Sequence, residues 1–344
     1  MKAMVLTGIR QMEMRNVPEA VIMNPLDVRI RMSAVGICGS DIHYYTRGNI
    51  GSQKVTYPFT VGHEGAGVVI ETGAGVKNVK QGDSVAIEPA ISCNECDQCR
   101  AGRHNTCRKL KFLGCPGQAE GCLSEYIIIP EQCCFKIPGK LSYDHGSISE
   151  PLAIGIYSVK RSGNIKGLKA GVMGFGPIGM SVHLAARDQG AGDIYVTDKI
   201  DERLSIAMNE GAAYTGNPMK ENIVETIRDK EPFGLDVVFE CCGQQEALDQ
   251  AIDILKPGGK LMVVGIPEFD FWSVNVEKTR RREISILFVR RQENCTGTAL
   301  KMMNNGRLDV SRMVTHRFPF GQTKDAFDLV ADYKDGVMKA MIYF

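Results

Sequence analysis

The run GFGPIG over residues 174–179 constrains the fold of this chain more than any other feature. It matches the pattern G-x-G-x-x-G, and it lies between an apolar strand pattern and an apolar helix pattern, as the pattern requires. The first glycine permits a tight turn, the second lets the backbone approach a pyrophosphate, and the third lets the helix pack on the strand. A glycine-rich turn without a nucleotide is the alternative. The residues expected to bind a dinucleotide are Gly174, Gly176, Pro177, Ile178 and Gly179.

The type of dinucleotide is indicated by Asp198, which ends the next predicted strand. A carboxylate there accepts hydrogen bonds from ribose hydroxyls and repels a 2′-phosphate, so the sequence favours NAD over NADP. Lys199 and Arg203 lie close by in the sequence and offer the alternative, because a cation can receive that phosphate.

The pattern of strands and helices divides the chain in two. Residues 1–90 alternate short apolar strands with glycine turns, which is typical of an all-β domain. From about residue 151, strands alternate with helices, which predicts a parallel sheet with helices on its faces. A length of 344 residues is enough for about two domains. Helices are predicted at 151–163, 177–191, 201–212, 246–259, 297–306 and 323–336, and late strands at 170–176, 193–198, 235–243, 260–266 and 338–344.

The cysteines, 12 in all, are unevenly spread. The cluster Cys93, Cys96, Cys99 and Cys107 lies among loop-forming residues at about 90–110, where a metal can substitute for a hydrophobic core. Four thiolates at this spacing suit a closed tetrahedral zinc site; an iron–sulfur cluster or a redox thiol set is the alternative. Seven others have no ligand spacing and are expected to be ordinary thiols: Cys115, Cys122, Cys133, Cys134, Cys241, Cys242 and Cys295.

Composition excludes several classes of partner. The net charge of +1 argues against nucleic acid, and no run of 18 apolar residues predicts a membrane span. The run Arg280-Arg281-Arg282 is expected to be a solvated face. Because the first residues lack the apolar core of a signal peptide, we expect a reducing, cytoplasmic location in which thiolates stay free to bind metal.

A second group of metal-binding residue types lies in the β-rich part: Cys38, His63, Glu64 and Glu150. Thiolate, imidazole and carboxylate suit zinc, and three ligands with water leave an open catalytic position. The residues are far apart in the sequence, so a buried structural histidine and a core cysteine remain the alternative.

The chain resembles the zinc-dependent medium-chain dehydrogenase/reductase superfamily, and within it the sorbitol/xylitol (polyol) dehydrogenase branch. The matching segments, in order, are GICGSDIHYY (36–45), GHEGAGVV (62–69), GDSVAIEP (82–89), CNECDQCRAGRHNTC (93–107), SEPLAIGI (149–156), GFGPIG (174–179), YVTD (195–198) and VTHRFPF (314–320). The resemblance implies an α/β protein in which a GroES-like catalytic domain, residues 1–154 and 288–344, encloses a Rossmann NAD-binding domain, residues 155–287.

Site roles also follow from the resemblance. It implies two zinc ions per chain, with Cys38 and His63 as catalytic ligands and Glu64 as the third. Glu150 then binds zinc, orients its water or meets substrate. Ser40 and His43 resemble proton-relay positions, and Tyr44 and Arg290 resemble polyol-contacting positions. Further cofactor contacts are expected from Arg203, Val264, Gly265 and Ile266, and homo-oligomers, dimers or tetramers, are expected as well.

Two departures from the branch affect the expected substrate. The four-cysteine lobe, which animal sorbitol dehydrogenases generally lack, indicates a bacterial-type member. Arg291 follows Arg290 where the branch often has tyrosine, and a second guanidinium can pair with a carboxylate or phosphate. A sugar acid, a polyol phosphate or L-threonine is therefore the alternative to a neutral polyol, unless Arg291 faces solvent or a subunit interface. A nucleotide-binding protein without catalysis is the alternative of another class.

Overall fold

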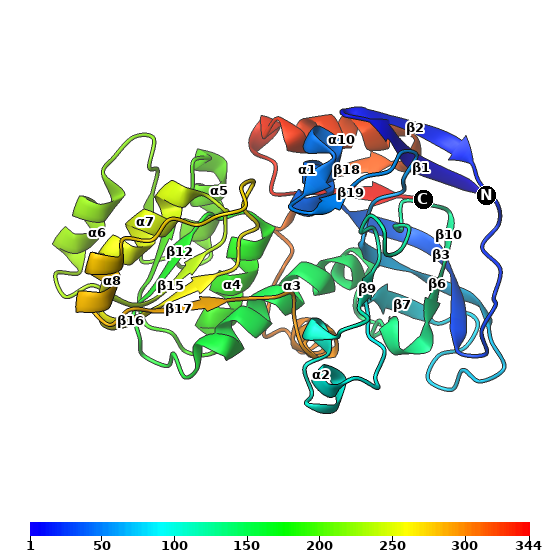
Figure 1. The fold of residues 1–344 in the computed structure, drawn as a ribbon, viewed down its shortest axis with the longest axis horizontal. Helices are drawn as coiled ribbons and strands as arrows, with labels where there is room; N and C mark the ends of the chain where they lie inside the picture. The colour runs from blue at the N-terminus through cyan, green and yellow to red at the C-terminus, as the bar shows by residue number, and fades with distance from the viewer. The chain divides into compact units, whose positions relative to one another are not determined.

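The computed structural model describes residues 1–344, which form two compact units (Figure 1). The β-rich unit comprises Met1–Glu150, Thr296–Gly306 and Met313–Phe344. The α/β unit comprises Pro151–Cys295 and Arg307–Arg312. No helix is long and apolar enough to cross a membrane.

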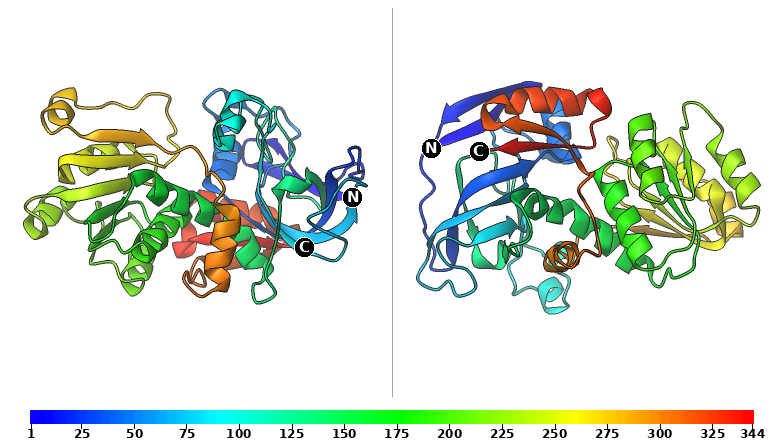
Figure 2. Two further views of the ribbon diagram at one scale, coloured as in Figure 1. Left: turned by 90° about the horizontal axis from the view of Figure 1, so that it is seen from below. Right: turned by 180° about the vertical axis from the view of Figure 1, so that it is seen from behind.

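The β-rich unit is built on a seven-stranded sheet with the path β11-β7-β6-β3-β19-β18 and β10 also paired to β3. The long strand β3 makes this possible, because β10 pairs with its first half and β19 with its last residues. Figure 2 shows the C-terminal strand, in red, beside the blue strands of the same unit. The strands are β1 (Lys2–Gly8), β2 (Gln11–Asn16), β3 (Asp27–Gly36), β4 (Asn49–Ile50), β5 (Gln53–Lys54), β6 (Glu64–Thr72), β7 (Ser84–Ile87), β8 (Ala90–Ile91), β9 (Lys111–Phe112), β10 (Tyr126–Pro130), β11 (Cys134–Lys136), β18 (Val314–Pro319) and β19 (Lys339–Tyr343).

Helices α1 and α10 pack on each other beside this sheet. Tyr45 of α1 is fully buried, and its ring meets Phe327 of α10 edge-on at 5.4 Å between centroids. The Tyr45 hydroxyl donates to Asp328 at 2.7 Å, so the buried ring keeps a partner for its polar end. The unit's helices are α1 (Gly39–Arg47), α2 (Asp97–Arg100), α9 (Thr296–Asn304) and α10 (Thr323–Ala331), with short 3₁₀ turns at His104–Thr106, Glu131–Cys133, Phe320–Gln322 and Lys334–Gly336.

The α/β unit contains a six-stranded sheet in the order β14-β13-β12-β15-β16-β17, all parallel. Chain order reverses between β12 and β15, which makes the carboxyl ends of these strands the expected ligand edge of a Rossmann fold. Helices pack against this sheet (Figure 1). The strands are β12 (Ala170–Met173), β13 (Ile194–Thr197), β14 (Tyr214–Gly216), β15 (Leu235–Glu240), β16 (Leu255–Val263) and β17 (Ser285–Phe288); the helices are α4 (Pro177–Asp188), α5 (Asp201–Asn209), α6 (Ile223–Lys230), α7 (Gln245–Ile254) and α8 (Val276–Arg281).

Helix α3 (Tyr143–Ser162) begins before the predicted start at residue 151. Pro151 lies inside it, where proline removes one backbone donor and normally favours a helix start. The predicted helix over 246–259 is also wrong at its end, because α7 stops at Ile254 and β16 begins at Leu255. Pro257 and the two glycines after it cannot continue a helix but are tolerated in the entry to a strand.

The arginine run at the C-terminal end of α8 is only partly the solvated face that its charge predicts. Arg280 and Arg281 are exposed and pair with Glu277. Arg282 instead turns inward and donates to the backbone oxygens of Ile252, Asp253 and Leu255. It therefore satisfies the free carbonyls at the end of α7, the position where a cation stabilises a helix.

Candidate active site

Cys38 precedes helix α1 as its N-cap residue. Its backbone N–H donates to Asp41 Oδ2 at 3.1 Å, and Ser40 Oγ lies 3.4 Å from its sulfur. Glu64 begins β6 and His63 directly precedes it, and β6 pairs with the end of β3 at Gly36. The end of β3 and the start of β6 thus place the thiol, imidazole and carboxylate together.

Asp41 orients His63. Its carboxylate is fully buried, accepts the Gly62 N–H at 3.1 Å and lies 3.3 Å from His63 Nδ1. Burial lowers the pKa of His63, but Asp41 and Cys38 outweigh it and hold that pKa well above its usual value. With Nδ1 facing a carboxylate, Nε2 is the nitrogen left for a metal, which is the arrangement that fixes the tautomer of a metal-bound histidine.

Glu64 has a cationic partner that the sequence did not suggest. Lys339 Nζ, on β19, lies 2.7 Å from Glu64 Oε1 and 2.6 Å from Oε2, and it also donates to the Ile37 carbonyl at 2.9 Å. Both side chains are 1% exposed. The ammonium therefore has all three donors engaged, and the pair is neutral as a whole.

Glu150, on α3, is buried, and its Oε2 accepts no hydrogen bond from the chain. Burial raises its pKa to about 8, with His63 lowering it and Glu64 raising it. A buried carboxyl oxygen without a partner is costly, so it indicates a group that the chain itself does not supply, such as a metal or its water.

The donor set fits zinc. One ligand atom each from Cys38, His63 and Glu64 lies within 4.8 Å of the others. The set mixes a thiolate, an imidazole and a carboxylate, and zinc accepts all three. The orphaned Glu150 Oε2 adds the feature expected beside an open coordination position.

Other predicted site residues differ in their surroundings. Ser40 and His43 are half-buried on α1. Tyr44 is 4% exposed and its hydroxyl donates to Gln53 at 3.2 Å, so in this structure the ring belongs to the core of the unit. Arg290 and Arg291 follow β17 in the α/β unit, where Arg290 is exposed and Arg291 half-buried with a positive φ of 51°.

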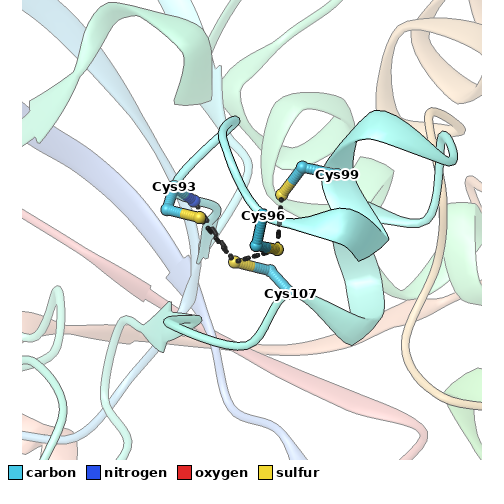
Figure 3. A group of neighbouring side chains, drawn as sticks. All are labelled: Cys93, Cys96, Cys99 and Cys107. Atoms are coloured by element: carbon cyan, nitrogen blue, oxygen red, sulfur yellow. Dashed lines mark hydrogen bonds between the residues drawn. The ribbon is translucent and has the colours of Figure 1, made fainter.

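The four cysteines of the lobe come together as a second group of residues that could hold a metal ion (Figure 3). The sulfur of Cys96 lies 3.5 Å from that of Cys99 and 3.9 Å from that of Cys107, which is 3.4 Å from that of Cys93. A tetrahedron with zinc–sulfur bonds of about 2.3 Å has sulfurs about 3.8 Å apart, so the spacing fits. Backbone N–H groups lower the pKa of Cys96 to about 6, which favours the thiolate; His104 is outside this group of four.

The glycine run lies at the carboxyl end of β12, as its pattern predicts. Gly174 has a φ of +88°, and a Cβ at Gly179 would lie 1.9 Å from the Gly174 carbonyl oxygen. Asp198, after β13, accepts the Phe175 N–H at 2.6 Å and so braces the loop. Arg203 Nη1 lies 3.9 Å from Asp198. The N–H groups of Val264 and Gly265 donate to the Glu240 carbonyl, and Ile266 is exposed.

Two residues of the metal site were missed at the sequence level. Asp41 had a detectable signal, because an acid three residues after an N-cap is a capping-box position. Lys339 also had one: it is a lone cation in the apolar strand segment MKAMIYF and needs a buried partner. Neither signal identifies which partner the side chain meets, because that depends on strand pairing across the whole unit.

Comparisons with known proteins show the family to which the chain belongs. Residues 24–139 match the family model described as alcohol dehydrogenase GroES-like domain, and residues 177–305 match zinc-binding dehydrogenase. The chain is 36% identical over 344 residues to sorbitol dehydrogenase of Bacillus subtilis, covering 100% of this chain and 97% of the relative. It is 37% identical to L-idonate 5-dehydrogenase of Vitis vinifera, covering 90% and 86%. A zinc-binding dehydrogenase of Sinorhizobium meliloti, solved with NADP, shares 30% identity and a TM-score of 0.90, covering 100% and 99%.

The chain therefore belongs to the zinc-binding dehydrogenases with a GroES-like domain, the medium-chain dehydrogenase/reductase superfamily, and within it to the polyol dehydrogenase branch. It is an enzyme that acts on a CH–OH group with a nicotinamide cofactor. The expected fold class, a GroES-like domain with a Rossmann domain, is confirmed.

Proposed function

We propose that this enzyme oxidises a secondary alcohol of a sorbitol- or xylitol-like polyol to a ketose with NAD as acceptor. The observation that carries the proposal is the convergence of Cys38, His63 and Glu64 beside the orphaned Glu150 carboxyl in the β-rich unit. The relatives named sorbitol dehydrogenase support the substrate class. The β-rich unit is then the catalytic domain and the α/β unit the cofactor domain.

The residues of the catalytic site have separate tasks. Cys38 and His63 would hold a zinc ion, with Glu64 as third ligand and Glu150 beside the open position. When bound, zinc supplies a Lewis acid that lowers the pKa of a substrate hydroxyl, and NAD supplies the hydride acceptor. Asp41 holds the imidazole in one tautomer. Ser40 would accept the substrate proton and pass it to His43, and Tyr44 and Glu150 would contact the substrate from the β-rich unit. Arg290 stays the polyol-contacting residue that the resemblance implies.

The metal content tests the ligand set. We expect about two zinc ions per chain, one in each centre, measured by elemental analysis. Cys38→Ser should reduce the content to about one and abolish activity. If Glu64 is a ligand, Glu64→Gln weakens zinc binding in competition with a chelator more than Glu150→Gln does. If Glu150→Gln weakens zinc binding more than Glu64→Gln does, the roles of the two carboxyl groups are exchanged. If the unmodified chain binds only about one zinc ion and forms no NADH on any alcohol, a non-catalytic nucleotide-binding protein is favoured.

Cofactor choice rests on Asp198, whose carboxylate at the end of β13 disfavours a 2′-phosphate. Arg203 and Lys199 support the NADP alternative. Steady-state kinetics with NAD and with NADP decide between the two cofactors. Asp198→Ala should reduce the preference of the enzyme for NAD over NADP.

A sugar acid is the second candidate, because Arg291 adds a guanidinium and a relative is named L-idonate 5-dehydrogenase. NAD reduction is measured over a panel of neutral polyols, sugar acids, polyol phosphates and L-threonine. If the substrate is anionic and Arg291 binds it, Arg291→Ala should raise KM for that substrate and leave KM for neutral polyols unchanged. An unchanged KM for the anion would refute the role of Arg291.

We also propose a cytoplasmic homo-oligomer, a dimer or tetramer. Strand β17 is the edge of the parallel sheet, and its Phe288 is 60% exposed, which is the kind of edge that pairs with a second copy. Sedimentation should show a dimer or larger, and Phe288→Lys should shift it toward the monomer. A monomeric unmodified chain would overturn this.

A further inference from the structure

Glu240 is a buried carboxyl group that has no role in the proposed reaction. It ends β15 at the carboxyl edge of the parallel sheet and has no exposed surface. Burial raises its pKa, although nearby backbone N–H groups lower it. Buried glutamates are rare unless they are paired, and the hydrogen bonds to this side chain come from backbone N–H groups rather than from a cation.

The hydrogen bonds of Glu240 link two loops. Its Oε1 accepts the N–H of Cys242 at 2.8 Å and of Gly243 at 2.6 Å, in the loop after β15. Its backbone carbonyl accepts the N–H of Val264 at 2.8 Å and of Gly265 at 2.9 Å, in the loop after β16. Four donors from the two loops therefore converge on one residue.

The two loops are in backbone contact at this point. A Cβ added to Gly265 would lie 2.3 Å from the Gly243 nitrogen and 2.7 Å from Glu240 Oε2. A Cβ added to Gly243 would lie 2.3 Å from the Ile266 carbonyl oxygen. Such contacts leave no room for adjustment, so the position of one loop determines that of the other.

The loop after β12, which carries the glycine run, also contacts the loop after β15. A Cβ at Gly174 would lie 2.7 Å from Cys242 Cβ, and the Cys241 N–H donates to the Met173 carbonyl at 2.8 Å. The loops after β12, β15 and β16 therefore meet around Glu240. This edge, beside the point where strand order reverses, is where a parallel sheet of this type binds a dinucleotide.

We propose that Glu240 is a positioning residue for the dinucleotide: it holds the loops 241–244 and 264–267 in the conformation to which the cofactor binds. The role rests on the proposed use of NAD by this unit. Glu240 does not touch the cofactor, because it is fully buried. Its Oε1 is the atom that matters, since Oε2 accepts no hydrogen bond from the chain.

The structure supplies a conservative variant and a disruptive one. Glu240→Gln keeps the Oε1 acceptor and replaces only the oxygen that accepts nothing. Glu240→Leu keeps most of the volume and removes the acceptor, which leaves two buried N–H groups without a partner. Glu231→Met is the matched control. Glu231 is a buried glutamate of the same unit, but it lies before the amino end of β15 and bonds Lys169 and Tyr195.

The test measures the NADH dissociation constant by fluorescence and the exchange of backbone amides without cofactor. Glu240→Leu should weaken NADH binding about tenfold or more and speed exchange at Cys242 and Gly243, while Glu240→Gln should stay within about threefold of the unmodified enzyme. Glu231→Met should lower the melting temperature and leave NADH binding unchanged. Unchanged NADH binding in Glu240→Leu, with only a lower melting temperature, would overturn the proposal. Failure of the unmodified enzyme to bind NADH would instead overturn the cofactor assignment on which it rests.

Discussion

Replacing Lys339 with methionine tests the buried ion pair beside the metal site. The change removes an ammonium that lies 2.6 and 2.7 Å from the two Glu64 oxygens, where both side chains are 1% exposed. Breaking a buried pair leaves an uncompensated charge and costs about 3–5 kcal/mol. Zinc bound by Glu64 supplies a compensating positive charge, so we expect the loss of unfolding free energy to be larger in chelator-treated protein than in zinc-loaded protein.

Equilibrium urea unfolding gives the measurement, with each variant compared with the unmodified chain in the same metal state. Lys324→Met is the control, because Lys324 also pairs with a carboxylate but is half-exposed, where a pair contributes about 0–1 kcal/mol. In a Glu64→Gln background, Lys339→Met should cost about 2 kcal/mol less, since the charge it neutralises is gone. The reasoning is refuted if Lys339→Met costs the same in both backgrounds.

Three further changes test other parts of the structure. Cys107→Ser should reduce zinc from about two to about one per chain and lower the melting temperature without changing NADH affinity; two retained zinc ions would contradict the lobe assignment. Gly179→Ala puts a Cβ where only 1.9 Å separates it from the Gly174 oxygen, so titration should show NADH binding at least about tenfold weaker, and an unchanged affinity would disprove the close approach. His183 is fully buried, and burial lowers its pKa from 6.5 to about 4. The unfolded chain therefore binds the proton more readily, and about 3 kcal/mol of stability, present above pH 6.5, is lost as the pH falls toward 4. His183→Gln should flatten urea-unfolding stability over that range, and an unchanged slope would argue against it.

The features that the sequence predicted best are those that depend only on residues close together in the chain. The glycine run, its flanking strand and helix, and the spacing of Cys93, Cys96 and Cys99 are local patterns with local physical causes. The helix α6 was missed because 223–230 carries two acidic and two basic residues in eight positions, which hides its apolar stripe at Ile223 and Ile227. Strand β17 was missed because it follows the arginine run.

Contacts between segments that are distant in the sequence could not be predicted as well. The pairing of Glu64 with Lys339 spans 275 residues and depends on β19 pairing with β3. The role of Glu240 depends on two loops meeting at backbone distance, which no spacing in the sequence expresses. The hydrogen bond from the Tyr44 hydroxyl to Gln53 likewise joins α1 to β5 and could not be read from the sequence, and a substrate contact at Tyr44 stays a prediction.

The insertion of β19 between β3 and β18 has a consequence for how the chain assembles during synthesis. The first 150 residues leave the ribosome without the strand that completes their sheet, and 188 residues, from 151 to 338, separate Glu150 from Lys339. Until that strand arrives, β3 exposes unpaired backbone along its last residues, and Glu64 has no cation beside it. Most of the α/β unit is meanwhile complete. The nascent β-rich unit therefore depends on a late, long-range contact, which makes this step slow and the partly made chain dependent on protection from aggregation.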